Sequence, residues 1–230
     1  MRMRHKPNLI PRMERCADWH VKEPEALRGK WRETFPEYKE LRLELGCGKG
    51  RFTCEQARRC PDMLLLAVEK VADAMVVAME RAEAEGVENV RFMDKDAALL
   101  PDMFAPGEIS RIYINFPDPW RKTRQYKRRL TAPEFLQKYT ALLPEGGQVW
   151  FKTDNRPLYE WSVESFTLCG WKLEPMPEGT PMTDYEAKFT EQGLPIYRVV
   201  ATRPTVPPEK LPDVSEIPVP AAEEQEDEEA

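Results

Sequence analysis

Short apolar runs alternate with longer amphipathic segments along the middle of the chain. The apolar runs, each typical of a strand, cover residues 41–45, 63–69, 90–93, 111–116, 148–153, 171–174 and 196–202. Helix-like segments follow several of them, at residues 51–60, 71–85, 131–143 and 156–169. Strands separated by helices of this length are typical of βαβ units. The pattern therefore predicts an α/β fold with a doubly wound, mainly parallel, seven-stranded sheet.

Signals at the ends of these segments refine the prediction. Gly86 stops the second helix. The third begins at Thr131-Ala132-Pro133-Glu134, with Thr131 as N-cap and a proline in the first turn. Residues 183–189, between the last two strands, are expected to form a loop. Because no helix is predicted there, one of these two strands is expected to run antiparallel at the edge of the sheet.

Three zones of different composition divide the chain. Residues 1–38 form a basic N-terminal extension, expected to be ordered only where it packs on the rest of the protein. Residues 39–203 contain all of the predicted strands and form the globular domain. Residues 204–230 are rich in proline and acid, so they cannot bury enough apolar surface to offset chain entropy. This acidic tail is therefore predicted to be disordered.

The net charge of −6 conceals an uneven distribution along the 230 residues. Nine acidic residues and one lysine lie from Glu209 onward, so residues 1–208 carry 33 basic and 31 acidic groups, a net charge of +2. An acidic chain of this kind can still bind an anionic partner, because the local field steers association.

Other compositional features narrow the class of protein. The five cysteines are scattered without a CxxC pair, and the only histidines are His5 and His20, so no metal site is expected. An odd number of cysteines and no recognisable signal peptide favour a reducing, cytoplasmic setting. The longest apolar stretch, residues 63–68, is too short to span a bilayer. We therefore expect a cytoplasmic protein without membrane contact.

The most informative segment follows the strand predicted at residues 111–116. It reads NFPDPWRKTRQYKRRL, and six of the nine residues 121–129 are lysine or arginine. Pro117 and Pro119 exclude a helix or a central strand, so a stiff loop must leave the strand end, where open α/β sheets bind their ligands. A carboxylate, Asp118, and a large aromatic residue, Trp120, share that loop with the cationic run. The combination indicates an enzyme that acts on nucleic acid.

A glycine-rich turn, Gly46-Cys47-Gly48-Lys49-Gly50, follows the first strand. Arg51 stands where a dinucleotide site usually has its third glycine, so the turn can also be a plain glycine turn without a ligand. Three acids at the same lip of the sheet favour a ligand: Glu44, Glu69 and Asp96. Each acid alone can be a solvated carboxylate, but together they suit the sulfonium and ammonium groups of S-adenosylmethionine better than NAD.

The cationic run at residues 121–129 has two interpretations. Charge clusters are most often solvated faces. This cluster, however, lies at the carboxyl end of a strand and includes Tyr126, which can stack on a base or contact a phosphate. Contact with nucleic acid is therefore favoured, and it should be salt-dependent. Trp120 can be a platform for a base or a residue of the core.

Six motifs occur in this order along the chain: LELGCGKG, AVEK, MDKDA, NFPDPWRKTRQYKRRLT, FKTDN and MTDYEAKFTEQGLPIYR. Their order and spacing resemble the TrmB family of tRNA (guanine-N7-)-methyltransferases over roughly residues 1–202. The resemblance implies a Rossmann-like, class I methyltransferase fold, S-adenosyl-L-methionine as cofactor and tRNA as partner. It also implies methyl transfer to N7 of guanine 46, in the variable loop. A monomer or a homodimer is expected.

The resemblance assigns a role to each candidate residue. Asp118 falls on the catalytic position, and the cofactor-binding positions are Glu44, Gly46, Gly48, Glu69, Asp96 and Asp118. The substrate-binding positions are Lys122, Asp154, Thr183, Asp184, Tyr185 and Glu186. The RNA-contacting positions are Arg124, Gln125, Tyr126, Lys127, Arg128 and Arg129. Gln125-Tyr126 replaces a pair of histidines common in the family, so Tyr126 is the residue expected to stack. The basic N-terminal segment can contact RNA or cover the cofactor, and the acidic tail has no counterpart in the family.

Methylation at N7 suits these residues chemically. Neutral guanine has a lone pair and no proton at N7, so the reaction needs no general base and leaves a cationic purine. Alignment of two bound reactants can supply ~7–11 kcal/mol of the barrier, and a fixed carboxylate near the developing cation ~3 kcal/mol. Asp118 and Asp154 are therefore expected to orient guanine and stabilise its charge. Each has a structural alternative, Asp118 as a turn acid and Asp154 as a helix cap. Thr183 can likewise cap a local turn instead of closing over guanine with Glu186.

Three functions remain open from the residues. The first is methyl transfer to guanine N7 in tRNA. The second is a class I methyltransferase acting on a small molecule or a protein, for which the cations at residues 124–129 would be dispensable. The third is a tRNA-binding protein without catalysis, which would not take up the cofactor.

Overall fold

The computed structural model of the chain describes residues 6–220, and it contains one seven-stranded sheet. The strands are β1 (Glu40–Leu45), β2 (Met63–Val68), β3 (Val90–Met93), β4 (Arg111–Asn115), β5 (Gln148–Thr153), β6 (Lys172–Glu174) and β7 (Tyr197–Thr202). Their order in the sheet is β3-β2-β1-β4-β5-β7-β6. The predicted α/β fold with a mainly parallel, seven-stranded sheet is confirmed.

Helices connect most of the strands. The α-helices are α1 (Leu9–Arg15), α2 (Trp31–Thr34), α3 (Arg51–Arg59), α4 (Ala72–Ala84), α5 (Leu100–Met103), α6 (Pro133–Leu142), α7 (Arg156–Leu168) and α8 (Asp184–Glu191). Short 3₁₀ helices are η1 (Ala17–Trp19), η2 (Pro24–Leu27), η3 (Ala97–Leu99), η4 (Thr123–Arg128) and η5 (Val214–Glu216). The four predicted helices correspond to α3, α4, α6 and α7, with ends that differ by a few residues.

Two local predictions were wrong. Residues 183–189 were expected to be a loop, but they lie in and just before α8, which connects β6 to β7. Thr131 was expected to cap α6, but the N-cap position is Ala132, without a side-chain cap. The Thr131 hydroxyl is instead buried and hydrogen-bonded to the Ser162 hydroxyl at 2.7 Å, so it joins α7 to the start of α6.

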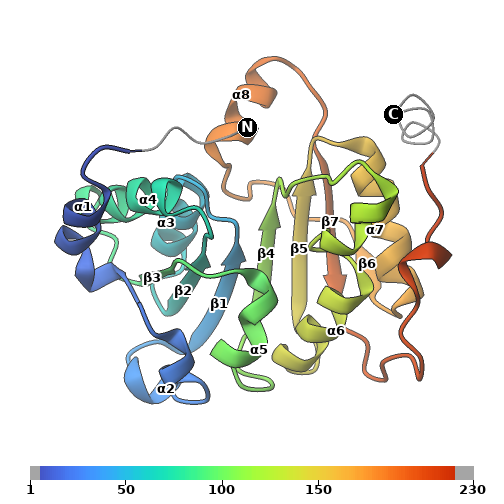
Figure 1. The fold of residues 1–230 in the computed structure, drawn as a ribbon, viewed down its shortest axis with the longest axis horizontal. Helices are drawn as coiled ribbons and strands as arrows, with labels where there is room; N and C mark the ends of the chain where they lie inside the picture. The colour runs from blue at the N-terminus through green and yellow to red at the C-terminus, as the bar shows by residue number, and fades with distance from the viewer. Residues whose placement is uncertain (1–5, 221–230) are drawn as a thin grey trace.

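The direction of the strands fixes one functional edge of the sheet. β1 pairs in parallel with both β2 and β4, and β4 pairs in parallel with β5. β7 is antiparallel to both of its neighbours, β5 and β6, so the expected antiparallel strand is present and lies beside the edge strand β6. In Figure 1 the arrows of β1, β4 and β5 point the same way, and α8 lies beyond their tips. The strand order reverses between β1 and β4, which is where open α/β sheets bind ligands.

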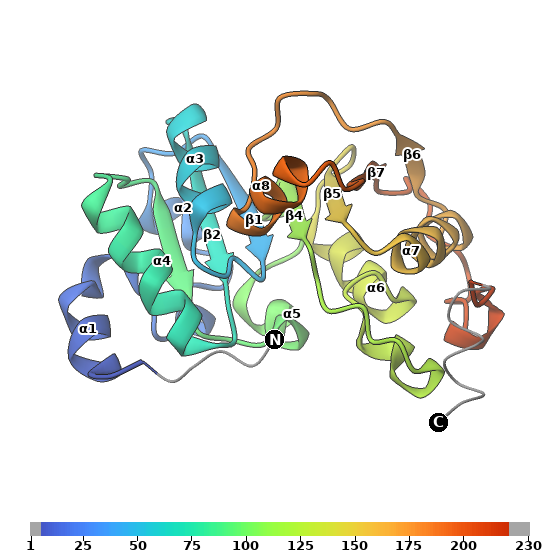
Figure 2. The ribbon, with the colours of Figure 1, turned by 90° about the horizontal axis from the view of Figure 1, so that it is seen from above.

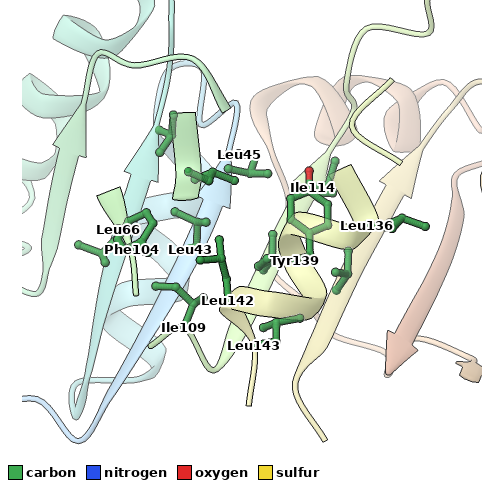
Figure 3. Close-up of a cluster of buried hydrophobic side chains, with 14 of the residues drawn as sticks. Leu43, Leu45, Leu66, Phe104, Ile109, Ile114, Leu136, Tyr139, Leu142 and Leu143 are labelled. Carbon is green, nitrogen blue, oxygen red and sulfur yellow. The ribbon is translucent and has the colours of Figure 1, made fainter. Parts of the chain in front are cut away.

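The alternation of side chains along the strands builds a core on each face of the sheet. On one face the leucines of β1 and β2 pack against α5 and α6, as Figure 3 shows for Leu43, Leu66, Phe104 and Tyr139. On the other face Leu65 of β2 joins residues of α3 and α4. Because both faces are covered, β2 is apolar throughout and buried along its whole length. The sheet is therefore a rigid support for the loops at its carboxyl edge.

The described part of the N-terminal extension packs on the domain. Trp31 is fully buried in the core beneath α5 and donates its indole N–H to the Met103 carbonyl at 2.9 Å. Arg12 of α1 donates two hydrogen bonds to the Glu80 carboxylate of α4, at 2.8 and 2.6 Å. The charge of Arg12 is therefore neutralised by an ion pair within the protein. Residues 1–5 lie outside the described part of the chain.

The prediction that the acidic tail is disordered was wrong for residues 204–220. Ile217 is 2% exposed and packs in a small cluster with Tyr126, Ala132 and Trp161. Asp213 and Glu216 form a capping box around η5. The segment therefore docks on the part of the protein that carries the cationic run. Residues 221–230, which hold the remaining acids, lie outside the described residues.

Within residues 6–220, no helix is long and apolar enough to cross a membrane. All five cysteines are free thiols. Burial raises the pKa of the Cys54 thiol to about 12, so this side chain is an apolar packing group at neutral pH.

Candidate active site

The glycine turn between β1 and α3 has the backbone shape that requires glycine. Gly46, Gly48 and Gly50 all have positive φ values, of 77°, 56° and 77°. A Cβ atom at Gly50 would lie 2.8 Å from the Cβ of Ala78, so this glycine allows the turn to approach α4. Cβ atoms at Gly46 and Gly48 would meet nothing within 4 Å, which leaves open space along the turn.

One of the predicted acids holds this turn, and a second joins the elements on either side of it. Glu69, just after β2, accepts hydrogen bonds from the Gly48 N–H at 3.0 Å and the Val71 N–H at 2.9 Å. Glu44, in β1, is buried and accepts from the Thr53 hydroxyl at 2.6 Å and the Asn115 amide at 3.2 Å. Burial raises the pKa of Glu44 to about 7.

The third acid lies at the next strand end along the same edge. Asp96 caps η3 by accepting from the Ala98 N–H at 2.9 Å, and this bond lowers its pKa. Lys70 lies 3.3 Å from the same carboxylate. Two apolar side chains near these acids, Val71 and Leu99, are 40% and 41% exposed. The sequence analysis missed them, although an apolar residue two or three positions after a strand-end acid is a readable signal.

The loop after β4 is strained at both ends. Phe116 and Trp120 have positive φ values of 51° and 47°, a conformation that costs ~1–3 kcal/mol for a residue other than glycine. The Phe116 N–H donates to the Lys152 carbonyl of β5 at 2.8 Å, which fixes the loop to the sheet. Asp118 lies exposed on this loop, beyond the end of β4, and β4 pairs with β1, the strand that leads into the glycine turn.

The cationic run does not present all of its side chains to solvent. Lys122, Arg124, Lys127 and Arg128 are exposed, and Gln125 is half-buried. Tyr126 and Arg129 are buried, at 2% and 0% exposure, so the prediction that they contact RNA is wrong for this structure. Trp120 is half-buried, and the guanidinium of Arg128 lies over its ring, 5.1 Å from the centroid. The exposed cations therefore follow the loop that carries Asp118, and Arg128 contacts its last residue, Trp120.

Helix α8 covers the carboxyl edge of the sheet. Figures 1 and 2, from two directions, show it over the tips of β1 and β4. Thr183 caps the helix, with its hydroxyl accepting from the Glu186 N–H at 2.9 Å, as the structural alternative proposed. Asp184 faces Arg81 at 3.4 Å and Arg51 at 3.9 Å, so two cations of α3 and α4 hold the helix start.

Tyr185 of α8 contacts one side chain from each of two other elements. The Tyr185 hydroxyl donates to the Asp154 carboxylate, after β5, at 3.2 Å. The Tyr185 ring lies 5.3 Å from that of Phe116 in an edge-to-face arrangement. Asn155, not Asp154, caps α7 by accepting from the Leu158 N–H at 2.7 Å, so the capping alternative for Asp154 was wrong. Two predicted substrate residues are thus brought together beside the loop of Asp118.

Glu186 has a structural role that the sequence analysis did not predict. Its carboxylate is 1% exposed and lies 3.2 Å from the Lys152 ammonium of β5 and 2.8 Å from Arg198 of β7. Lys152 also donates to the Pro181 carbonyl at 2.8 Å. Desolvation lowers the pKa of Lys152, whereas Glu186 acts to raise it. The buried pair fixes α8 to the sheet, so the expectation that Glu186 closes over a guanine is wrong for this structure.

The edge thus combines an acidic side with a cationic side. Acids lie at the ends of β1, β2 and β3, and that of β2, Glu69, binds the open glycine turn. Asp118 and Asp154 lie beyond the ends of β4 and β5. No group of three histidine, cysteine or acidic side chains within residues 6–220 has the arrangement of a metal site. The sheet order, the glycine turn and these strand-end acids define a Rossmann-like protein of the class I methyltransferase type.

Comparisons with known proteins agree with this class. A family model described as "Putative methyltransferase" matches residues 39–199. A tRNA (guanine-N(7)-)-methyltransferase of Listeria monocytogenes serotype 4b is 41% identical over 209 residues, covering 87% of this chain and 98% of that protein. One from Bacillus subtilis is 40% identical over 206 residues, covering 86% and 97%. This chain belongs to the tRNA (guanine-N(7)-)-methyltransferase family, and the resemblance to TrmB proteins is confirmed.

A solved structure supports the fold separately. The crystal structure of the 16S rRNA methyltransferase KamB superimposes with a TM-score of 0.59 at 18% identity, covering 76% of this chain and 93% of that one. At this identity the likeness concerns the fold alone.

Proposed function

We propose that this protein transfers a methyl group from S-adenosylmethionine to N7 of guanine 46, in the variable loop of tRNA. The observation that carries the proposal is the arrangement at the β1–β4 edge. Acids suited to a cationic cofactor lie at the ends of β1, β2 and β3, Asp118 follows the neighbouring strand β4, and exposed cations suited to an RNA backbone follow Asp118 along the chain. The names of the relatives at about 40% identity support the same reaction.

The residues at the acidic side fit the cofactor. S-adenosylmethionine supplies a methyl group activated by its sulfonium centre. The space at Gly46 and Gly48 admits a ligand against the backbone, and Glu69 and Asp96 are suited to ribose hydroxyls and the adenine edge. The exposed apolar surfaces of Val71 and Leu99 are suited to an adenine ring. Glu44, buried beneath the turn, adds negative charge when it ionises.

The residues beyond β4 and β5 are suited to the guanine. A carboxylate can accept hydrogen bonds from N1–H and the exocyclic amine, which distinguishes guanine from adenine. We assign this role to Asp118 and Asp154, whose negative charge would favour the cation that forms on the purine. No proton has to leave N7, so neither acts as a base. The family resemblance adds Lys122, Thr183, Asp184 and Tyr185 to the proposed substrate site, in which Thr183 and Asp184 also fix the start of α8.

The exposed cations are suited to phosphates on both sides of the base. Arg124, Lys127 and Arg128 lie within eight residues of Trp120 along the chain. Each phosphate contact contributes through release of counterions, so binding should weaken steeply with salt. In an A-form duplex N7 lies in a deep, narrow groove. The proposal therefore requires a guanine that is exposed or turned out of its stack.

Nucleoside mass spectrometry of unmodified tRNA after incubation with the protein and cofactor tests the proposal. We expect one 7-methylguanosine per tRNA, and none when guanine 46 is replaced by adenine. Asp118→Asn should reduce the rate about 100-fold or more, as for loss of one well-placed electrostatic group. The matched control is Asp102→Asn, an exposed aspartate of α5 at the opposite end of the sheet from α8 (Figure 1). Absence of 7-methylguanosine with the unaltered protein would overturn the proposal.

A further inference from the structure

Arg129 differs from the other cations of its run. Lys127 and Arg128, directly before it, are exposed, whereas Arg129 is fully buried. A buried guanidinium requires partners inside the protein, because transfer of an unpaired charge out of water is very unfavourable. The contacts of Arg129 therefore indicate what this side chain does.

Its guanidinium holds the backbone of the loop that carries Asp118. The Nε–H donates to the Pro119 carbonyl at 2.8 Å, and Nη2 donates to the Trp120 carbonyl at 3.3 Å. Pro119 directly follows Asp118. Two consecutive carbonyls on the reactive loop are thus bound by one planar group, which has the fork geometry needed to reach both.

The same guanidinium is fixed by aromatic rings from two elements. Its central carbon lies 3.5 Å from the centroid of the Tyr126 ring in η4 and 4.7 Å from the Trp161 ring in α7. Ile217 of the C-terminal segment packs in the same cluster. Arg129 therefore connects the loop to a helix of the rigid domain.

We propose that Arg129 is a positioning residue, which holds the Asp118 loop in its reactive shape and does not contact RNA. The proposal rests on the proposed function, because it assigns the role of one residue in that reaction. Trp120, at the end of the loop, keeps a positive φ of 47°, a conformation that persists only where the surroundings enforce it. The bonds of Arg129 to Pro119 and Trp120 supply that constraint.

The experiment compares Arg129→Lys with Lys127→Ala. Both lie in the same run, but Lys127 is exposed. Arg129→Lys keeps the charge and loses the planar fork. We expect its kcat to fall roughly 100-fold, as for a misplacement of about 1 Å. Its KM for tRNA and the slope of log KM against log salt should remain those of the unaltered protein. Lys127→Ala should instead raise KM for tRNA and reduce that salt slope by about one, with kcat little changed.

A raised KM and a reduced salt slope in Arg129→Lys, with kcat intact, would overturn the proposal and identify Arg129 as an RNA contact. Unchanged kinetics would also overturn it. If Arg129→Lys does not fold, as judged by circular dichroism and cofactor calorimetry, Tyr126→Leu takes its place, because Tyr126 packs against the Arg129 guanidinium. The same result is expected of it, a lower kcat with an unchanged KM for tRNA. The unaltered protein is assayed in parallel. If the unaltered protein makes no 7-methylguanosine, the proposed function itself is wrong. If it does and the variants behave otherwise than expected, only the assignment of Arg129 is wrong.

Discussion

Replacing Lys152 by methionine tests whether the buried ion pair holds α8 over the active site. The Lys152 and Glu186 side chains are 2% and 1% exposed, and their charged atoms lie 3.2 Å apart. At an effective dielectric constant of about 20, a pair at that distance interacts by ~5 kcal/mol. The Arg198 guanidinium, 38% exposed, still neutralises Glu186 in the variant. We therefore expect a net loss near the lower end for a broken buried pair, ~3 kcal/mol of unfolding free energy.

A double-mutant cycle in urea, followed by circular dichroism, measures this energy. Glu186→Gln alone also leaves a buried charge without its partner, whereas the combination with Lys152→Met removes both charges. The double variant should therefore lose less stability than the sum of the single variants, with a coupling of ~2 kcal/mol. Lys188→Met is the matched control, because Lys188 is an exposed lysine of α8 and should change stability by less than ~0.5 kcal/mol.

A cost below ~0.5 kcal/mol for Lys152→Met, with no coupling to Glu186→Gln, would refute this reasoning. It would mean that water reaches the pair and that α8 is not held to β5 and β7 by it. In the active protein the same substitution should raise KM for tRNA, because α8 carries Tyr185 and Asp184.

Three other predictions concern the cofactor side and the C-terminal segment. Burial raises the pKa of Glu44 in the folded protein to about 7, so its contribution to stability is full below pH 4.5 and is lost as pH rises through 7. In thermal unfolding, the stability of Glu44→Gln relative to the unaltered protein should therefore increase by ~3 kcal/mol between pH 5 and 9. Leu99→Ala should weaken S-adenosylmethionine binding roughly tenfold in calorimetry. Leu168→Ala, which changes an equally exposed leucine of α7, should leave the affinity unchanged. Equal affinities for the two variants would contradict the assignment of Leu99 to the adenine ring. Ile217→Ala should cost ~2 kcal/mol in urea unfolding, at the lower end for a buried side chain, whereas Val206→Ala, 82% exposed in the same segment, should cost almost nothing; equal costs would mean that the segment does not dock in solution.

The sheet and the acidic side of the site could be predicted because their signals are local. The β2 run is apolar throughout, as a strand covered on both faces must be, and it ends at Glu69 beside the glycine turn. The carboxyl ends of parallel strands meet at one edge, so finding the strands also finds the acids. The positions of Glu44, Glu69 and Asp96 relative to the strand ends were therefore enough to predict that they lie at the same edge of the sheet.

Helix α8 was missed because its stability does not come from an apolar stripe. It has eight residues, and the one that is buried is Glu186, whose environment depends on Lys152 and Arg198 from two other strands. The pattern of hydrophobic positions contains no trace of such a pair. Ile217 was missed for a related reason, since a single apolar residue in an acidic, proline-rich segment gives no periodicity.

The cationic run was misread at two positions because composition does not reveal orientation. Six lysines and arginines in nine residues indicate a charged surface, yet Tyr126 and Arg129 face inward. The two are three residues apart, which is the repeat of a 3₁₀ helix such as η4. An aromatic residue and an arginine at that spacing were therefore the available signal for a buried pair.

The most direct test of methyl transfer to guanine N7 uses tRNA in which guanine 46 is replaced by 7-deazaguanine, which has carbon in place of N7. Incorporation of a labelled methyl group into this tRNA is compared with incorporation into the ordinary transcript, and a binding measurement confirms that both tRNAs bind equally. We predict one methyl group per ordinary tRNA and none in the 7-deaza form. Equal incorporation into both would contradict the central claim.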